Sequence, residues 1–240
     1  MSEPGFLTAT RAAYDTVAAS YARLLAHALE QNPYDRAVLG LYAELAHAAA
    51  AARDPSPRQP SAAPAAHVAP RAARPARVVE VGCGPGRITA HLASLGLAAR
   101  GIDLSPRMVA EARRRHPGLE FEVGSMTSLE LPEHALDGLV AWYSVIHVPP
   151  SRQRALYTGF HRALAPGGLL LLAFQCGLER RRLQEAYGHG GLELDAYRLR
   201  PERVEEDLAA AGFGLVTRTV REPSGSELNE QAYLIARALP

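Results

Sequence analysis

The sequence contains no lysine, only two cysteines and no long apolar run. All 26 basic residues are arginine, which excludes a mechanism that needs a lysine base or a lysine Schiff base. Cys83 and Cys176 are too few for a disulfide framework and have no zinc-ligand spacing. No segment approaches the roughly 20 apolar residues that cross a bilayer, and the first residues are polar and have no signal region. We therefore expect a cytoplasmic protein with no membrane partner.

The charge balance gives no reason to expect a nucleic-acid partner. The 26 basic and 25 acidic residues leave a net charge of +1, whereas nucleic-acid and anionic-membrane binders usually carry a basic excess. The 240 residues, 48% of them hydrophobic, suffice for one substantial core and one or two domains. Both a monomer and a homodimer are compatible with these numbers.

Composition divides the chain into three predicted parts. Residues 1–53 are predicted to form an N-terminal helical cap, with helices over 8–30 and 34–52 separated by Asn32-Pro33. Residues 54–76 are rich in proline and alanine and have no hydrophobic periodicity, which is typical of a flexible linker. Residues 77–240 form the predicted core.

Strand and helix patterns alternate through this core. We predict strands over 78–81, 98–104, 119–123, 136–142, 169–174, 213–221 and 231–238. We predict helices over 87–95, 106–115, 151–164, 178–187 and 201–211, with the basic run 179–182 on a solvated helix face. This order predicts a Rossmann-like α/β fold: a seven-stranded, mostly parallel sheet with an antiparallel last strand and helices on both faces.

A glycine-rich turn follows the first strand of the core. Gly82, Gly84 and Gly86 permit positive φ angles and let a ligand touch the backbone. Asp103 ends the next strand, where an acid can accept both hydroxyls of a ribose. A nicotinamide dinucleotide site uses G-x-G-x-x-G, but Arg87 occupies the third glycine position here. The spacing therefore favours a nucleotide-like cofactor without a pyrophosphate.

Four segments in order resemble motifs of class I S-adenosylmethionine-dependent methyltransferases. These are the loop 80–86, then 101–108, 136–142 and 164–168. With Tyr14-Asp15, Tyr21 and the segment 141–147, the chain is also similar to small actinobacterial methyltransferases, many of them from natural-product pathways. The resemblance implies S-adenosylmethionine as cofactor, S-adenosylhomocysteine as product, and methyl transfer to an oxygen, nitrogen or carbon atom of a small-molecule acceptor in secondary metabolism.

The resemblance and the strand ends together imply a set of cofactor-binding residues. They are Tyr14, Tyr21, Glu80, Gly82, Cys83, Gly84, Gly86, Asp103, Leu104, Met108, Gly124, Ser125, Met126, Trp142 and Tyr143. The family often places an acid beside the adenine after the third strand, where this chain has Gly124-Ser125-Met126. Ser125 can accept one hydrogen bond there, and Met126 can pack on the adenine ring. Cys83 is best explained as a small packing residue.

Acceptor and catalytic residues are expected around the same strand ends. His147 and His189 are the candidate bases, because histidine titrates near neutrality, and Tyr21 is a further catalytic candidate. A loop histidine that only packs locally, or only meets solvent, is an equally open interpretation. The predicted acceptor-binding residues are Ser144, His147, Phe174, Gln175, Tyr187, His189 and Tyr197, with residues 187–191 as a lid.

The same residues bear on other possible functions. Amino-methylating DNA enzymes carry Asp/Asn-Pro-Pro-Tyr after the fourth strand, whereas this chain has residues 141–144, Ala-Trp-Tyr-Ser. No acidic cluster follows that strand, so we expect no metal. A non-catalytic S-adenosylmethionine-binding regulatory module stays open as the alternative, ahead of a nucleic-acid or protein methyltransferase.

Overall fold

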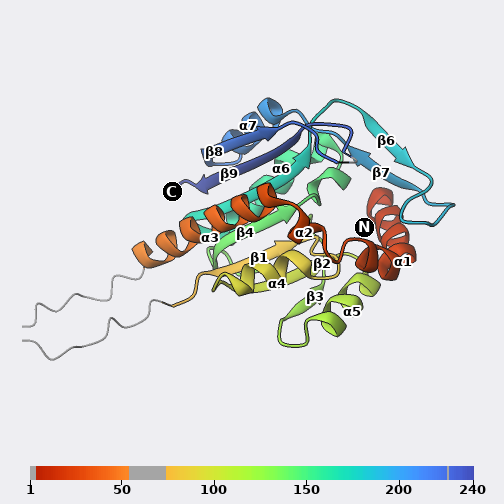
Figure 1. Ribbon diagram of the computed structural model, residues 1–240. Helices are drawn as coiled ribbons and strands as arrows, with labels where there is room; N and C mark the ends of the chain where they lie inside the picture. The colour runs from red at the N-terminus through yellow and green to blue at the C-terminus, as the bar shows by residue number, and fades with distance from the viewer. Residues whose placement is uncertain (1–3, 54–73, 226) are drawn as a thin grey trace, which may run out of the picture.

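The computed structural model describes residues 4–53, 74–225 and 227–240 (Figure 1). The predicted linker over 54–76 lies outside the described residues except for its last three. The three-part division of the chain therefore stays a prediction. No helix in the described part of the chain is long and apolar enough to cross a membrane.

Seven strands form one sheet in the order β3-β2-β1-β4-β5-β9-β8. The strands are β1 (Arg77–Val81), β2 (Ala98–Asp103), β3 (Phe121–Val123), β4 (Leu136–Trp142), β5 (Leu164–Gln175), β8 (Phe213–Arg221) and β9 (Gln231–Ala238). Strands β1 to β5 pair in parallel, and β9 runs antiparallel to both β5 and β8. The predicted fold class, including the antiparallel last strand, is confirmed.

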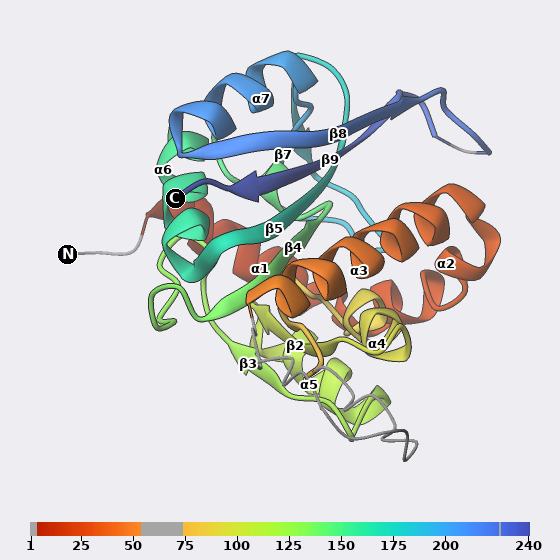
Figure 2. The ribbon, with the colours of Figure 1, turned by 90° about the vertical axis from the view of Figure 1, so that its left-hand side faces the viewer.

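Helices cover both faces of this sheet, as Figure 2 shows. On one face, α3 (Pro33–Arg53) and α4 (Arg87–Ser94) pack against the strands, where Tyr42 and Leu92 meet Val78. On the other face, α6 (Pro150–Ala163) and α7 (Pro201–Ala210) pack around Val79. Because successive strand residues point to opposite faces, a sheet covered on both sides requires unbroken apolar strands. This requirement explains the valine- and leucine-rich runs.

The first helix lies across the carboxyl ends of the strands. The predicted helix over 8–30 is divided into α1 (Gly5–Leu24) and α2 (Ala28–Gln31). Asp15 fastens α1 to α5 (Pro106–Arg115): its Oδ1 accepts hydrogen bonds from Ser105 Oγ at 2.5 Å and from the Arg107 amide at 3.1 Å. Tyr14 and Tyr21 share one side of α1, with ring centroids 6.0 Å apart.

The predicted helix over 178–187 is wrong. Residues Arg180–Leu183 form strand β6, which pairs antiparallel with β7 (Leu194–Tyr197) as a separate hairpin. The basic run lies on this strand, and its ion pairs cross to the partner strand: Arg180 meets Asp195 at 2.6 Å and Arg182 meets Glu193 at 3.5 Å. Cross-strand charge pairs stabilise a hairpin. The acidic partners lie outside the predicted helix, so the pattern of residues within 178–187 does not include them.

A tight turn closes the end of this hairpin. Ala186 and His189 exchange both backbone hydrogen bonds at 3.0 Å. Between them, Tyr187 and Gly188 have φ angles of 54° and 81°, which a two-residue hairpin turn of type I′ requires at both central positions. The tip of the hairpin faces α1 (Figure 1).

Asp137 joins the two ends of the chain that flank residues 54–73. Its buried carboxylate accepts hydrogen bonds from Arg53 at 2.5 Å, from Arg74 at 2.5 Å and from the Arg77 amide at 2.7 Å. Burial alone would raise the pKa of Asp137, but the hydrogen bonds from Arg74, the Arg77 amide and Arg53 outweigh it and lower the pKa. The end of α3 and the start of β1 are thereby held at one point.

Candidate active site

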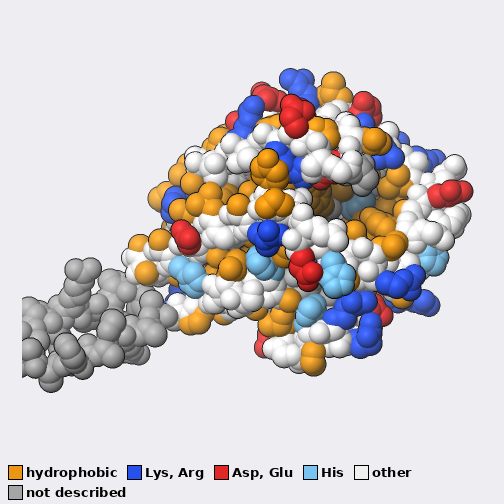
Figure 3. Space-filling model, viewed as in Figure 1, with side chains coloured by type: hydrophobic (Ala, Val, Ile, Leu, Met, Phe, Trp, Pro, Cys, Tyr) orange, Lys and Arg blue, Asp and Glu red, His pale blue; other side chains and the backbone are white. Residues whose placement is uncertain are grey.

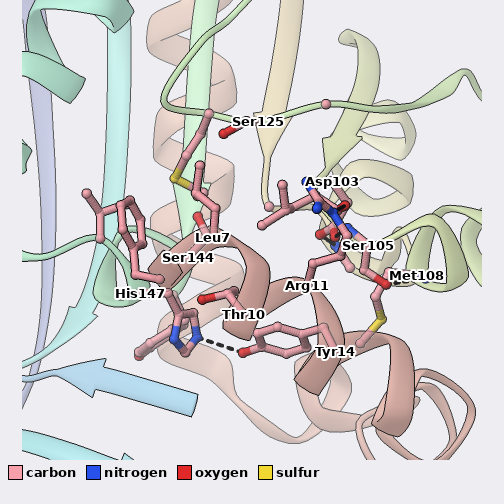
Figure 4. A pocket seen from close by; sticks show the side chains of 18 of the residues that line it. Leu7, Thr10, Arg11, Tyr14, Asp103, Ser105, Met108, Ser125, Ser144 and His147 are labelled. Carbon is pink, nitrogen blue, oxygen red and sulfur yellow. Dashed lines mark hydrogen bonds between the residues drawn. The ribbon is translucent and has the colours of Figure 1, made fainter. Parts of the chain in front are cut away.

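Two connected cavities lie where the parallel strands end beneath α1. The first, here called the narrow cavity, is shown in Figure 4. Leu7, Thr10, Arg11 and Tyr14 of α1 lie along one side, and Asp103 stands on the other. The second, here called the wide cavity, measures about 790 Å³ and continues past the glycine loop. Residues that line both cavities are Tyr14, Tyr21, Gly82, Gly84, Trp142 and Tyr143.

Asp103 is held by backbone amides on both of its oxygens. Oδ2 accepts from Gly84 N at 2.7 Å, and Oδ1 accepts from Ser105 N at 2.8 Å. Burial raises the pKa of Asp103 to about 6, against these two hydrogen bonds. Each carboxylate oxygen can accept a second hydrogen bond. The side chain is thus fixed in place with two acceptors available to neighbouring hydroxyls.

Gly82 of the glycine loop packs against Ser144, just after β4, with no space for a side chain. Gly82 has a φ of 71°, and a Cβ built on it would lie 2.4 Å from Cβ of Ser144. Ser144 is held there because its Oγ donates to the Val81 carbonyl at 2.7 Å. Gly86 differs, because it lines neither cavity; a Cβ there would lie 2.7 Å from the Phe121 ring. Its place is in the packing at the start of α4.

The other residues predicted for the cofactor also lie along these cavities. Leu104, Met108, Gly124, Ser125 and Met126 line the narrow cavity, whereas Glu80 and Cys83 line the wide one. Cys83 packs in a buried cluster with Phe121, as a small packing residue does. Tyr143, a non-glycine residue, has a φ of 50°, a strained conformation that often marks functional sites.

His147 contacts neighbours through both ring nitrogens. Nδ1 lies 2.8 Å from the Asp195 carbonyl oxygen, which can only accept, so Nδ1 carries the proton. Nε2 then accepts from the Tyr14 hydroxyl at 2.7 Å (Figure 4). Burial lowers the pKa of His147, although the bond to Asp195 opposes this, and burial raises the pKa of Tyr14. The pair is therefore a neutral imidazole facing a protonated phenol.

His189, the second candidate base, lines neither cavity. Its Nε2 lies 2.8 Å from Ser20 Oγ, whose own proton goes to the Val17 carbonyl, so His189 donates to Ser20. Beside it, the Tyr187 ring packs on Tyr21 with centroids 4.7 Å apart, and Tyr187 lines the wide cavity. These contacts fasten the hairpin tip to α1, as a lid over the site would require.

The predicted acceptor residues separate into two groups. Gln175 and Tyr187 line the wide cavity, and Ser144 and His147 line the narrow one. Phe174 is fully buried in the core on the α6 face and reaches neither cavity. Tyr197 packs against that same core and also lines neither cavity. The alternation of β5 explains Phe174, because its side chain points opposite to Gln175.

Several cavity residues were not predicted from the sequence. In the narrow cavity these include Phe6, Leu7, Thr10, Arg11, Ser105 and Val148. In the wide cavity they include Gln31, Asn32, Tyr34, Asp35, Arg87, Ser224, Glu227 and Gln231. Leu7, Thr10 and Tyr14 recur at three- and four-residue spacing, so extending the Tyr14–Tyr21 face towards the start of α1 finds the first group.

Asp35 and Glu227, which line the wide cavity, belong to a hydrogen-bonded network. Tyr233 donates to Asp35 Oδ1 at 2.7 Å and accepts from Arg221 Nε at 3.1 Å. Arg221 also forms two hydrogen bonds with Glu227, one of them from Nη2 to Oε1 at 2.7 Å. Figure 3 shows the surface hollowed between the β6–β7 hairpin and helices α1 and α2. These hydrogen bonds fix the positions of the polar side chains on this side of the wide cavity.

Comparison with known proteins agrees with this geometry. Residues 78–168 match the family model described as a methyltransferase domain. A trans-aconitate 2-methyltransferase from Methylobacterium nodulans is 43% identical over 109 residues, which are 45% of this chain and 41% of that protein. The chain thus spans about two fifths of the curated relatives it matches first. Residues 78–168 therefore resemble a methyltransferase domain, in agreement with the class I S-adenosylmethionine-dependent family predicted from the sequence.

Solved structures of methyltransferases have a fold similar to that of this chain. A methyltransferase from Methanosarcina mazei superposes with a TM-score of 0.62 at 22% identity, covering 69% of this chain and 93% of that one. Magnesium protoporphyrin IX methyltransferase from Synechocystis PCC 6803, solved with bound S-adenosylmethionine, has a TM-score of 0.64 at 15% identity and covers 99% of each chain.

The cofactor of the domain is S-adenosylmethionine, and the cavity residues fit it. Asp103 offers two fixed acceptors for the ribose hydroxyls. Gly82 and Gly84 expose backbone between the two cavities, where any side chain would fill the space. Met126 and Trp142 supply apolar surface to the narrow cavity.

Proposed function

We propose that this protein transfers a methyl group from S-adenosylmethionine to an oxygen, nitrogen or carbon atom of a small molecule, in secondary metabolism. The observation that carries the proposal is the wide cavity of about 790 Å³ that shares its lining with the cofactor-binding cavity. Cavities of roughly 300–1,000 Å³ are typical of small-molecule sites. It is bounded by α1, α2 and the hairpin tip, and it is not an open basic groove of the kind that nucleic acid requires.

The relatives support the same class of acceptor. By their names, one acts on trans-aconitate and another on magnesium protoporphyrin IX, and both are small molecules. Their chemical difference leaves the identity of the acceptor to be established by experiment.

The bound cofactor supplies an electrophilic methyl group on a positively charged sulfur, which the acceptor attacks directly. The protein's task is to align the acceptor, exclude water and remove a proton where the acceptor has one. Tyr14 lines both cavities and donates to His147. In the proposed relay, an acceptor O–H or N–H gives its proton to Tyr14 Oη while the Tyr14 proton moves to Nε2 of His147. The Asp195 carbonyl then stabilises the imidazolium through Nδ1.

A screen with trideuteromethyl-labelled S-adenosylmethionine tests the proposal. The purified protein is incubated with panels of phenols, amines and carboxylic acids, including trans-aconitate, and products are read by mass spectrometry. Labelled product in at least one panel is expected, with none from Asp103→Ala. A protein that binds S-adenosylmethionine yet labels no small molecule, while labelling DNA or protein in a parallel lysate arm, would contradict the proposal. Binding with no labelling in any arm would favour the regulatory module.

A further inference from the structure

Arg87 has an unmet hydrogen-bonding requirement at the edge of the wide cavity. It is the first residue of α4, directly after the glycine loop, and it lines the cavity. Its Nη1 is buried and has no hydrogen-bond partner among the described residues. A buried donor without a partner is costly, and a charged one is especially so. Native proteins seldom keep such a group without a ligand or partner for it.

Each acid that lines the same cavity has a hydrogen-bond partner other than Arg87. Glu227 is committed to Arg221 through two hydrogen bonds. Glu80 accepts from Thr89, and burial raises its pKa to about 8, so its carboxyl is protonated at neutral pH. Burial also raises the pKa of Asp35, whose Oδ1 accepts from Tyr233.

No ion pair joins Arg87 to an acid in the part of the chain that the structure describes. It is also the single cationic side chain among the described residues that line the wide cavity. The cavity therefore holds one positive charge that makes no ion pair with the acids lining it.

The position of Arg87 places this charge where the two cavities join. Gly82 and Gly84 line both cavities, and Arg87 stands just beyond them on the wide side. The Tyr21 ring covers the loop here, 3.7 Å from where a Cβ on Gly84 would lie. A ligand that extends from Asp103 across the loop meets Arg87 next, and so does an acceptor seated in the wide cavity.

We propose that Arg87 binds a carboxylate at this junction. A guanidinium presents its N–H groups in a planar fork that matches a carboxylate, and such bonds are among the strongest that proteins form. Two molecules can supply the group: the methionine part of the cofactor, or an acceptor acid. The second source rests on the small-molecule function proposed above, whereas the first rests only on the cofactor.

Calorimetry on Arg87→Gln and Arg87→Lys separates the two sources. S-adenosylhomocysteine carries the methionine-type carboxylate, and 5′-methylthioadenosine lacks it. If the cofactor supplies the carboxylate, Arg87→Gln weakens S-adenosylhomocysteine binding about 10- to 100-fold. It leaves 5′-methylthioadenosine binding unchanged, and Arg87→Lys recovers part of the loss. Arg200→Gln, an exposed arginine outside both cavities, is the matched control, and thermal melts confirm that each variant folds.

The second arm uses protein saturated with S-adenosylhomocysteine and titrated with benzoate or tricarballylate. Unchanged S-adenosylhomocysteine affinity with a loss of carboxylate binding in Arg87→Gln assigns the site to the acceptor. The proposal is overturned if Arg87→Gln binds every probe with wild-type affinity. It is also overturned if the wild type binds neither acid and Arg87→Gln binds S-adenosylhomocysteine normally. Because all readouts are binding, a failed methylation screen leaves this result interpretable.

Discussion

The hydroxyl of Tyr14 lies 2.7 Å from Nε2 of His147, and the two residues reach this contact from different elements. Tyr14 belongs to α1, whereas His147 ends a short 3₁₀ turn after β4. The Asp195 carbonyl on the hairpin sets the tautomer of the imidazole. One hydrogen-bonded chain therefore connects the covering helix, the strand end and the hairpin.

Tyr14→Phe and His147→Ala should each lower kcat about 100-fold with a protic acceptor, a typical loss for general base catalysis. S-adenosylhomocysteine affinity should change little in calorimetry. Burial lowers the pKa of His147, so neutral, proton-accepting His147 persists below the ordinary histidine range. The wild-type rate should therefore hold through neutral pH and fall only on the acid side, and His147→Ala should lose that acid limb. Full turnover by both variants would show that alignment alone carries the reaction.

Asp103 should make cofactor affinity depend on pH. Its pKa is raised to about 6 by burial, and the ionised carboxylate is the form that accepts from both ribose hydroxyls. S-adenosylhomocysteine affinity should therefore fall as pH drops through about 6. Asp103→Asn should weaken binding about 100-fold at pH 8, equivalent to roughly 3 kcal/mol, and should flatten the pH dependence. Equal affinities for wild type and variant at pH 8 would refute the ribose assignment.

His189→Ala should loosen the hairpin without removing a base. His189 donates to Ser20 and lines neither cavity, so the pH profile of kcat should keep its wild-type shape. Amide exchange over residues 184–193 should accelerate, because one of the contacts between the hairpin tip and α1 is gone. Ser20→Ala is the matched variant and should give the same exchange pattern. A lost acid limb in His189→Ala would restore this residue as a base.

Replacing residues 54–73 with a short glycine–serine linker should preserve the fold. Arg53 and Arg74 both bind Asp137, so the flanking ends already meet, and loop length contributes only about 0.6 kcal/mol per doubling. The melting temperature and S-adenosylhomocysteine affinity should match wild type. Asp137→Asn should instead destabilise the protein by on the order of 3 kcal/mol, because it leaves arginines without their buried partner. A shortened protein that fails to fold would contradict this account.

The sheet could be predicted because the local sequence pattern of its strands indicates them. The run over 169–174 is apolar on both faces and follows a proline–glycine turn. The region over 178–187 gave no such signal: Leu178, Leu183 and Tyr187 are five and four residues apart, which fits neither a helical nor a strand period clearly. What decides it is pairing with Glu193 and Asp195, which is information from a partner strand.

The two cavities differ in how far sequence could describe them. The narrow cavity is lined largely by residues at motif loops, such as Gly82 and Asp103, so the resemblance located it. The wide cavity takes Tyr34 and Asp35 from the start of α3, and Glu227 from the β8–β9 loop. These look like ordinary polar surface residues until the fold brings them together. From the sequence, Arg87 argues only against a pyrophosphate, because the missing partner of its side chain is visible only in three dimensions.

Because β9 is antiparallel, the residues expected to contact the acceptor lie far along the chain from those expected to contact the methyl donor. Because β9 runs against β5, its first residue, Gln231, pairs with Gln175 at the end of β5. Residues Ser224, Gly225 and Glu227, which precede β9, therefore line the wide cavity, far in sequence from the glycine loop. Under the proposed function, exchanging this one loop alters the acceptor wall and leaves the methyl donor's contacts in place. Related chains can then differ in acceptor through changes within this short loop.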